Sequence, residues 1–411
     1  MSCLLLADDR PKIKDEGSTR AETARPSSYA VCRRIRSAVA VFLAGMLVAA
    51  LTGCRPAWQA TVLAPDGRPF TIDRQVLENL GDLAEKGHGV PLERVLLGAG
   101  HEVIERLIVV SDDGARHAFD WPAAANGETW WLENGELNIA GEEWPVARLE
   151  VEPPALLDRM QARITDIAAT AAAALGLPSP AQATGRALET PATSHVLLLF
   201  LDGLGYVRYA EALADGLIPN LTALGKPLVG LACYPPTTSV ATASLLTGAP
   251  PEVNGVYRRG IRKTNAETLF DVAKEAGLRI AAVEGEALAF NLRNAEVQLS
   301  GDRDGDGSTD DNVLTNALAT LEGGMPDLLY VHFHGIDDAG HTYGPGAPQE
   351  RAKIAEVDAA VGQLIQAVPP DTLVILFADH GMHAVSEDGR LGNHGHLIAR
   401  DMFIPIVLSV K

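Results

Sequence analysis

Seven side chains between Asp202 and His394 have the types and the spacing for chemistry at two metal ions that flank a hydroxyl nucleophile. They are Asp202, Thr238, Asp337, His341, Asp379, His380 and His394. Carboxylates and imidazoles are ligands for divalent metals, and a metal ion next to a hydroxyl lowers its pKa towards neutral pH. Histidine is also concentrated here, because seven of the eleven histidines of the chain fall between positions 332 and 396.

Long apolar runs precede three of these residues. Asp202 follows the run 196–201, and Asp379 and His380 follow the run 373–378. Apolar strands without alternation are covered on both faces, as in a parallel sheet, and such sheets present ligands at the carboxyl ends of their strands. Helical periodicity separates the runs. The sequence therefore predicts an α/β fold, a three-layer α/β/α sandwich with a mostly parallel central sheet.

Two further candidates belong to predicted helices. Asp337 and His341 are four residues apart, which brings both onto one side of a helical turn where they can share a metal. Thr238 stands between Thr237 and Ser239 at the start of the helical stretch 240–246. A hydroxyl there can cap the helix, and the same helix end directs backbone N–H groups at an anionic phosphoryl group. Both readings stay open for these three hydroxyls.

The order Asp, Thr, Asp/His, Asp/His, His resembles the alkaline phosphatase superfamily, and within it the type I phosphodiesterase and nucleotide pyrophosphatase branch. The resemblance extends over about residues 190 to 408. It implies two zinc ions, with manganese as the alternative, and a threonine nucleophile that forms a phosphothreonine intermediate. It implies that Asp337, His341 and His394 hold one ion, that Asp202, Asp379, His380 and Thr238 hold the other, and that Thr237 and Ser239 are the alternative nucleophiles.

The resemblance also has departures that bear on the substrate. The nucleotide pyrophosphatases carry asparagine and histidine three and four residues after the nucleophile, where this chain has Ala241 and Thr242. The substrate is therefore predicted only as a small phosphoester. The predicted function is that of an exported, metal-dependent phosphoester hydrolase of the phosphodiesterase type. A phosphomonoesterase and an inactive, surface-anchored binding protein are the alternatives.

The first 54 residues have the pattern of an export signal. Basic residues precede the apolar stretch 38–51, which ends in Leu51, Thr52, Gly53 and Cys54. This stretch is shorter than the roughly 20 residues of a membrane-spanning helix. The tetrapeptide resembles the bacterial lipoprotein box, which implies that Cys54 is lipidated and anchors the protein to the extracytoplasmic face of the cell membrane. An uncleaved anchor is the alternative.

The remaining chain divides into three predicted regions. Residues 55–152 are β-rich, with turn signals at 65–67, 112–114 and 133–135, and are predicted to form a small α+β domain. Its tryptophans either line a binding face or form a small core. Residues 153–190 are either an ordinary connector or a permuted element of the catalytic domain, because they resemble a segment that related enzymes carry after the last histidine. Residues 191–411 are the predicted catalytic domain.

The net charge, the cysteine content and an acidic loop indicate which partners and ions the chain can bind. The formal net charge of −19 repels nucleic acid, so no nucleic acid polymer is expected. Of the four cysteines, Cys233 would remain without a partner after signal cleavage and lipidation, so no internal disulfide is expected. The acidic loop from Asp302 to Asp310 follows the alternation of a calcium loop but has Val313 at the twelfth position. A structural calcium ion and an acidic surface loop remain alternatives, and the pattern does not predict an oligomeric state.

Overall fold

The structure is a computed structural model that describes residues 58–80, 89–126, 129–132, 134–303, 305, 307–387 and 389–411. The predicted signal peptide, residues 1–54, lies outside the described residues. In the described part of the chain, every helix is too short or too polar to cross a membrane.

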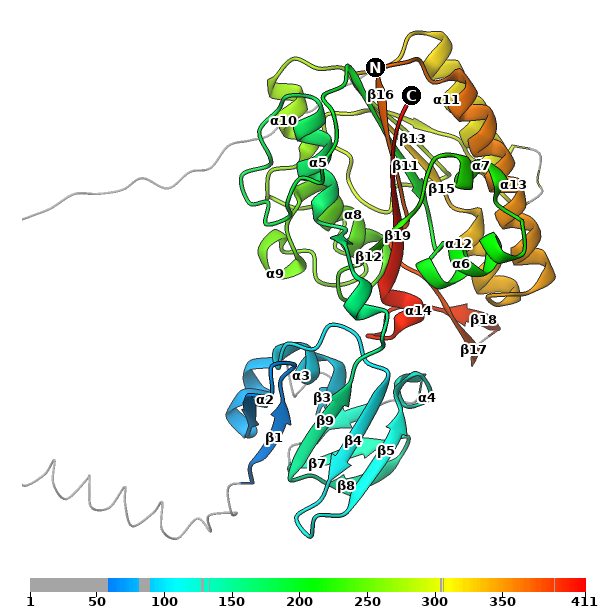
Figure 1. Cartoon of the computed structure of the whole chain (residues 1–411). Coiled ribbons are helices and arrows are strands. Elements are labelled where there is room, and N and C mark those ends of the chain that lie inside the picture. Colours follow the sequence, from blue (N-terminus) through cyan, green and yellow to red (C-terminus); the bar gives the residue numbers. More distant parts are fainter. Residues whose placement is uncertain are drawn as a thin grey trace, which may run out of the picture. The chain divides into compact units, whose positions relative to one another are not determined.

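An eight-stranded sheet forms the centre of the larger region (Figure 1). Only β19 (Phe403–Val410) runs antiparallel to its neighbours, and the other pairs are parallel. The inner strands are almost entirely buried, which agrees with their unbroken apolar runs, whereas the edge strand β14 (Glu296–Leu299) is exposed. The prediction of a mostly parallel sheet is therefore confirmed. In spatial order the strands are β10 (Ala162–Arg163), β12 (Leu228–Leu231), β19 (Phe403–Val410), β16 (Thr372–Phe377), β11 (His195–Leu201), β15 (Leu328–Phe333), β13 (Ile280–Glu284) and β14 (Glu296–Leu299).

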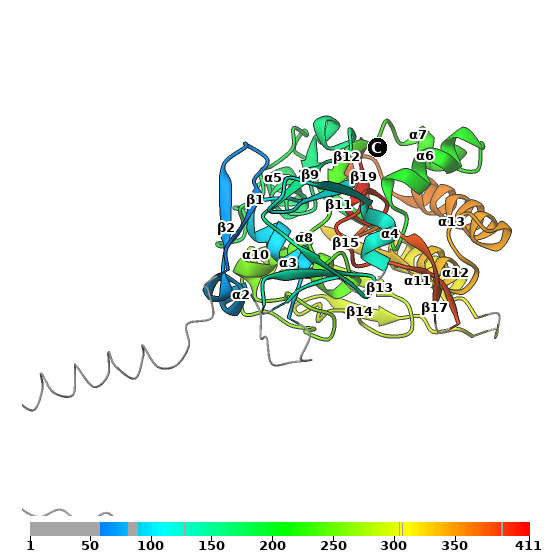
Figure 2. The ribbon, with the colours of Figure 1, turned by 90° about the horizontal axis from the view of Figure 1, so that it is seen from below.

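Helices cover both faces of this sheet and complete the three predicted layers (Figures 1 and 2). One layer contains α5 (Asp166–Ala174), α8 (Thr238–Thr247), α9 (Pro251–Asn254) and α10 (Leu269–Glu275). The other contains α6 (Tyr206–Ala214), α7 (Pro219–Ala223), α11 (Asp310–Glu322), α12 (Gly335–Tyr343) and α13 (Pro348–Ala367). The short helix α14 (Ala399–Met402) leads into β19.

The segment between the two predicted domains contributes to the larger sheet and its helical layer. Strand β10 pairs in parallel with β12, and α5 packs its alanine-rich surface against α8 and α10. Asp166 orders the segment, because its two carboxylate oxygens accept the backbone N–H groups of Arg163 and Arg186, each at 2.8 Å. Residues 162–186 are thus part of the larger region that contains this sheet.

The amino-terminal region contains two small antiparallel or mixed sheets. The predicted turns at 65–67 and 112–114 are confirmed, since each lies between paired antiparallel strands. Asn134 and Gly135 of the third predicted turn also lie between paired antiparallel strands, and position 133 lies outside the described residues. Trp121 and Trp131 are fully buried, so these two tryptophans belong to a core. The first sheet comprises β2 (Pro69–Ile72), β1 (Ala60–Leu63), β9 (Arg148–Glu152), β4 (Arg106–Val110) and β5 (Arg116–Asp120), and the second comprises β3 (Val90–Pro91), β6 (Thr129–Trp131), β7 (Glu136–Ile139) and β8 (Glu142–Pro145). The helices are α2 (Arg74–Leu80), α3 (Leu92–Gly98) and α4 (Trp121–Asn126).

Candidate metal centre

The carboxyl ends of three adjacent strands carry most of the candidate ligands. In the sheet, β11 lies between β16 and β15, so the residues that follow these strands meet at one edge. Asp202 follows β11, Asp379 and His380 follow β16, and α12 with Asp337 follows β15. These side chains are nearly or fully buried. The strand order, rather than proximity in sequence, thus brings them together.

A first group consists of Asp337, His341 and His394. The Nε2 atom of His341 is 3.3 Å from Oδ2 of Asp337, and Nε2 of His394 is 3.9 Å from Oδ1. Nδ1 of His341 donates to the carbonyl oxygen of Gly392, and Nδ1 of His394 donates to that of Pro236, each at 2.8 Å. These bonds set the tautomer and leave both Nε2 lone pairs directed at Asp337, as in histidines that bind metals.

A second group lies beside the first. Nε2 of His380 is 3.1 Å from Oδ2 of Asp379 and 3.5 Å from Oδ1 of Asp202. Asp202, Asp337 and His380 each offer a ligand atom, and these atoms lie within 4.8 Å of one another, as do those of the first group. Asp337 therefore belongs to both groups. The rings of His380 and His394 stack with centroids 3.7 Å apart, which places the groups side by side.

Six inward-facing atoms of this cluster are buried and have no hydrogen-bond partner. They are Oδ1 of Asp202, Oδ1 of Asp337, Nε2 of His341, Oδ2 of Asp379, Nε2 of His380 and Nε2 of His394. An unsatisfied buried polar group costs about 1–3 kcal/mol, so a set of them in one place needs an explanation such as a bound ion. Oxygen and imidazole nitrogen suit zinc or manganese. The residues present therefore fit two divalent cations.

The electrostatics of the cluster also favours bound cations. Burial raises the pKa of Asp379 well above its ordinary value, and the charges of Asp202 and Asp337 add to this effect. Burial lowers the pKa of His394 to about 3, and His380 contributes in the same direction. The imidazole of His394 is thus neutral, as a ligand must be. Three carboxylates in one buried space repel each other, and divalent cations there would relieve that repulsion.

The candidate nucleophile opens helix α8, on the segment that His394 contacts. Thr238 is half-buried, and the hydrogen bond from His394 to Pro236 ties the start of this segment to the first ligand group. Thr237 occupies the N-cap position, yet its side chain makes no capping hydrogen bond. The hydroxyls of Thr237 and Ser239 are buried without partners. The helix end thus leaves its first N–H groups available to an anionic ligand.

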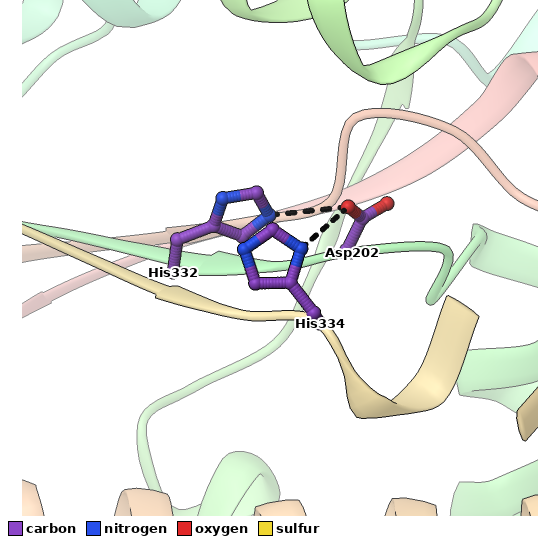
Figure 3. Close-up of side chains that lie close together, drawn as sticks. All are labelled: Asp202, His332 and His334. Atoms are coloured by element: carbon purple, nitrogen blue, oxygen red, sulfur yellow. Dashed lines mark hydrogen bonds and ion pairs between the residues drawn. The ribbon is translucent and has the colours of Figure 1, made fainter. Parts of the chain in front are cut away.

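Three residues of the site escaped the sequence-based prediction. Both ring nitrogens of His332 are engaged, Nε2 at 3.2 Å from Oδ2 of Asp202 and Nδ1 at 3.0 Å from Glu284. His334 likewise contacts Asp202 and Glu284, at 3.5 and 2.9 Å, and Figure 3 shows both rings directed at the Asp202 carboxylate. Burial opposes ionisation of Asp202, but the two histidines outweigh it and hold its pKa well below the ordinary range. The crowding of histidines after position 332 was the available signal.

The acidic loop is only partly covered by the described residues. The Asp302 carboxylate accepts the N–H groups of Gly305 and Gly307, at 2.7 and 3.0 Å. Asp310 is buried, and its carboxylate accepts the backbone N–H of His334 at 2.9 Å. Positions 304 and 306 lie outside the described residues. A calcium ion at this loop therefore stays a prediction.

Comparison with known proteins gives one family match that spans about half of the chain. A sequence model of the type I phosphodiesterase / nucleotide pyrophosphatase family matches residues 196–404. The catalytic subunit of GPI ethanolamine phosphate transferase 3 from Mus musculus is 35% identical over 82 residues, which are 20% of this chain and 8% of that protein. The human catalytic subunit of GPI ethanolamine phosphate transferase 2 is 24% identical over 267 residues, 56% of this chain and 25% of that protein. The chain thus spans a quarter or less of the length of these relatives.

Two solved structures match about half of the chain at low sequence identity. Phosphonoacetate hydrolase from Sinorhizobium meliloti 1021, in complex with phosphonoformate, is 21% identical with a TM-score of 0.39, over 50% of this chain and 60% of that one. Murine ectonucleotide pyrophosphatase / phosphodiesterase 5 is 14% identical with a TM-score of 0.42, over 53% of this chain and 88% of that one.

Proposed function

We propose, from the premise that this chain belongs to the type I phosphodiesterase / nucleotide pyrophosphatase family, that it is a two-metal phosphodiester hydrolase with Thr238 as its nucleophile. Membership of this family makes the chain a phosphoester-acting enzyme. The choice of a diester, of hydrolysis and of Thr238 is the proposal.

One observation supports the proposal more than any other. Six buried ligand atoms from four separate segments face one another without hydrogen-bond partners, beside the amino end of helix α8. We propose that Asp337, His341 and His394 hold one divalent cation and that Asp202, Asp379 and His380 hold the other. Such ions would lower the pKa of the nucleophile and stabilise the charge that develops on the entering and leaving oxygens.

The proposed reaction consists of two in-line displacement steps. The Thr238 hydroxyl loses its proton and its oxygen attacks phosphorus, so that a bond from phosphorus to this oxygen forms. The bond from phosphorus to the leaving oxygen breaks, and that oxygen takes up a proton and departs as the alcohol. Backbone N–H groups at the start of α8 hold the non-bridging oxygens during this step. A water molecule then attacks the phosphothreonine from the opposite side and restores the threonine hydroxyl. The histidine pair that binds one oxygen of Asp202 keeps its other oxygen directed into the site.

A transferase is the second candidate, because the curated relatives are named as ethanolamine phosphate transferases. In that case an alcohol, rather than water, would accept the phosphoryl group from Thr238. The two candidates share the first step and differ in the acceptor. To distinguish the two candidates, a diester is incubated with an added alcohol such as ethanolamine or glycerol. The measurement is the share of the phosphoryl group that is transferred to water and the share that is transferred to the alcohol.

The decisive experiment compares substrates, metals and hydroxyl variants. We expect turnover of bis-p-nitrophenyl phosphate in preference to p-nitrophenyl phosphate, loss of turnover with a chelator, and recovery with zinc or manganese. Thr238→Ala should lower kcat by at least about a thousandfold, as loss of a nucleophile does, whereas Thr237→Ala and Ser239→Ala should retain most of it. Preference for the monoester would indicate a phosphomonoesterase. No turnover of either ester after metal loading would favour a binding protein.

We further propose that the protein is exported and carries a lipid on Cys54. The apolar stretch 38–51 and the tetrapeptide that ends at Cys54 support this proposal. In a bacterial host, the full chain should incorporate a labelled fatty acid and sediment with membranes, and Cys54→Ser should do neither. Labelling of the Cys54→Ser variant would contradict the proposal.

A further inference from the structure

A buried carboxylate of the amino-terminal region binds two segments of the catalytic domain at once. Glu93, in helix α3, is 8% exposed. Its Oε2 accepts the hydroxyl of Tyr234 at 2.9 Å, and its Oε1 accepts the backbone N–H of Leu397 at 2.8 Å. Nδ1 of His396 lies 3.3 Å from both oxygens. The donors thus come from residues more than a hundred positions away in sequence.

Both segments lead directly into the candidate metal centre. Tyr234 stands four residues before Thr238, and Leu397 stands three residues after His394. The two segments also contact each other, because Nδ1 of His394 donates to the carbonyl oxygen of Pro236. Glu93 and this second hydrogen bond therefore connect the same two segments at two points. The relative position of the nucleophile and a metal ligand depends on both connections.

The surrounding contacts make the Glu93 connection stiff. The carbonyl oxygen of Leu397 accepts the N–H of Ile104 at 2.8 Å, so the backbone of Leu397 is held on both sides by the amino-terminal region. The side chains of Val95, Ile104 and Leu397 belong to one apolar core. A charge-assisted hydrogen bond in such a dry environment is stronger than one in water. Burial and Glu93 also raise the pKa of the Tyr234 hydroxyl well above its ordinary value, so it remains a donor.

We infer that Glu93 is a positioning residue for the phosphoester reaction, through which the amino-terminal region holds the nucleophile segment, residues 234–238, in register with the metal-ligand segment, residues 394–397. Glu93 acts through Tyr234 and Leu397 rather than on the substrate. The inference rests on the proposed function for its effect on turnover, and on the geometry alone for its effect on the two segments.

The test compares Glu93 with a control at the same boundary. Glu93→Ala removes both connections, and Tyr234→Phe removes only the one to the nucleophile segment. Glu93→Gln retains one acceptor oxygen for the Leu397 N–H and is the conservative variant. Glu102→Gln is the control at the same boundary, because Glu102 forms a bidentate ion pair with Arg163 between the same two regions, at 2.6 and 2.9 Å, and these two hydrogen bonds involve neither segment.

Hydrogen exchange and kinetics supply independent readouts. In the full chain, Glu93→Ala should speed amide exchange in peptides that cover 234–240 and 392–400 by about tenfold, and lower kcat by about tenfold with less than a twofold change in KM. Tyr234→Phe should affect the first peptide alone. Glu93→Gln should recover most of the protection in the second peptide. Glu102→Gln should leave both peptides and kcat unchanged.

Several results would overturn the inference. One is equal exchange in Glu93→Ala and Glu102→Gln, and another is faster exchange with an unchanged kcat. If Glu93→Ala does not fold, Tyr234→Phe decides, and its failure to loosen residues 234–240 would equally contradict the inference. If the unmodified protein hydrolyses no phosphoester, the proposed function fails. The exchange data would still show whether Glu93 holds the two segments.

Discussion

Gly203 is the position where one added methyl group should separate the two ligand groups. It follows Asp202 and has φ +74°, a conformation that favours glycine. A Cβ atom here would lie 2.9 Å from both Cα and Cβ of Asp337 and 3.1 Å from its Oδ1. Carbon atoms pack at about 3.5–4.0 Å, so Asp337 would have to move by about 0.6–1 Å. Asp337 is the residue that both candidate ligand groups share.

The expected magnitude has two parts. The backbone strain of alanine at positive φ costs about 1–2 kcal/mol, and forcing a methyl group into a packed site costs about 1–3 kcal/mol more. Gly203→Ala should therefore lower the free energy of unfolding by about 2–5 kcal/mol. Because a shift of about 1 Å in a catalytic group can cost a hundredfold in rate, kcat/KM should fall about a hundredfold.

Gly216→Ala is the matched control for this prediction. Gly216 has φ +70°, and a Cβ atom there meets nothing within 4 Å. The Gly216→Ala variant should lose about 1–2 kcal/mol of its free energy of unfolding through backbone strain alone, and it should retain its activity. Urea unfolding gives the stabilities, and diester hydrolysis with bound zinc per chain gives the effect on the site. If Gly203→Ala matched Gly216→Ala in stability, activity and zinc content, the close approach of Gly203 to Asp337 would not shape the site.

Three other predictions concern metal, protons and a thiol. Removal of the metal should lower Tm, because a ligand at a thousand times its Kd stabilises the native state by about 4 kcal/mol, and Asp337→Asn should show a much smaller shift with chelator. In the metal-free protein, the His394 pKa of about 3 lies below its ordinary value of 6.5, so below pH 6.5 the unfolded chain binds a proton that the native chain does not. The free energy of unfolding should therefore fall by up to about 1.4 kcal/mol per pH unit as pH drops from 6.5 towards 3, and urea titrations of His394→Asn should lack this component. Burial raises the pKa of Cys233 to about 12, so iodoacetamide should label it at pH 8 only after unfolding, and rapid labelling of the native chain would contradict its burial.

The residues at the ends of buried strands were predictable because the apolar residues that precede them in the sequence indicate the strand. The apolar runs before Asp202 and Asp379 are typical of strands covered on both faces, and the four-residue spacing of Asp337 and His341 indicates that both lie on one side of a helix. The structure shows each of these elements. The hairpin turns of the amino-terminal region were equally local, since turn type depends on the few residues within the turn. The sequence alone therefore predicts these particular elements and the ends at which their polar side chains emerge.

Contacts across the sheet were decided by the tertiary structure alone. The sharing of Asp337 between two ligand groups follows from the position of β11 between β16 and β15, which no local pattern specifies. The same holds for the approach of Glu284 to His332 and for the link from Glu93 to Tyr234. Periodicity reports which face of an element is buried, but not which element covers it. Those pairings depend on strand order and on packing between residues far apart in sequence, and only the folded chain supplies both.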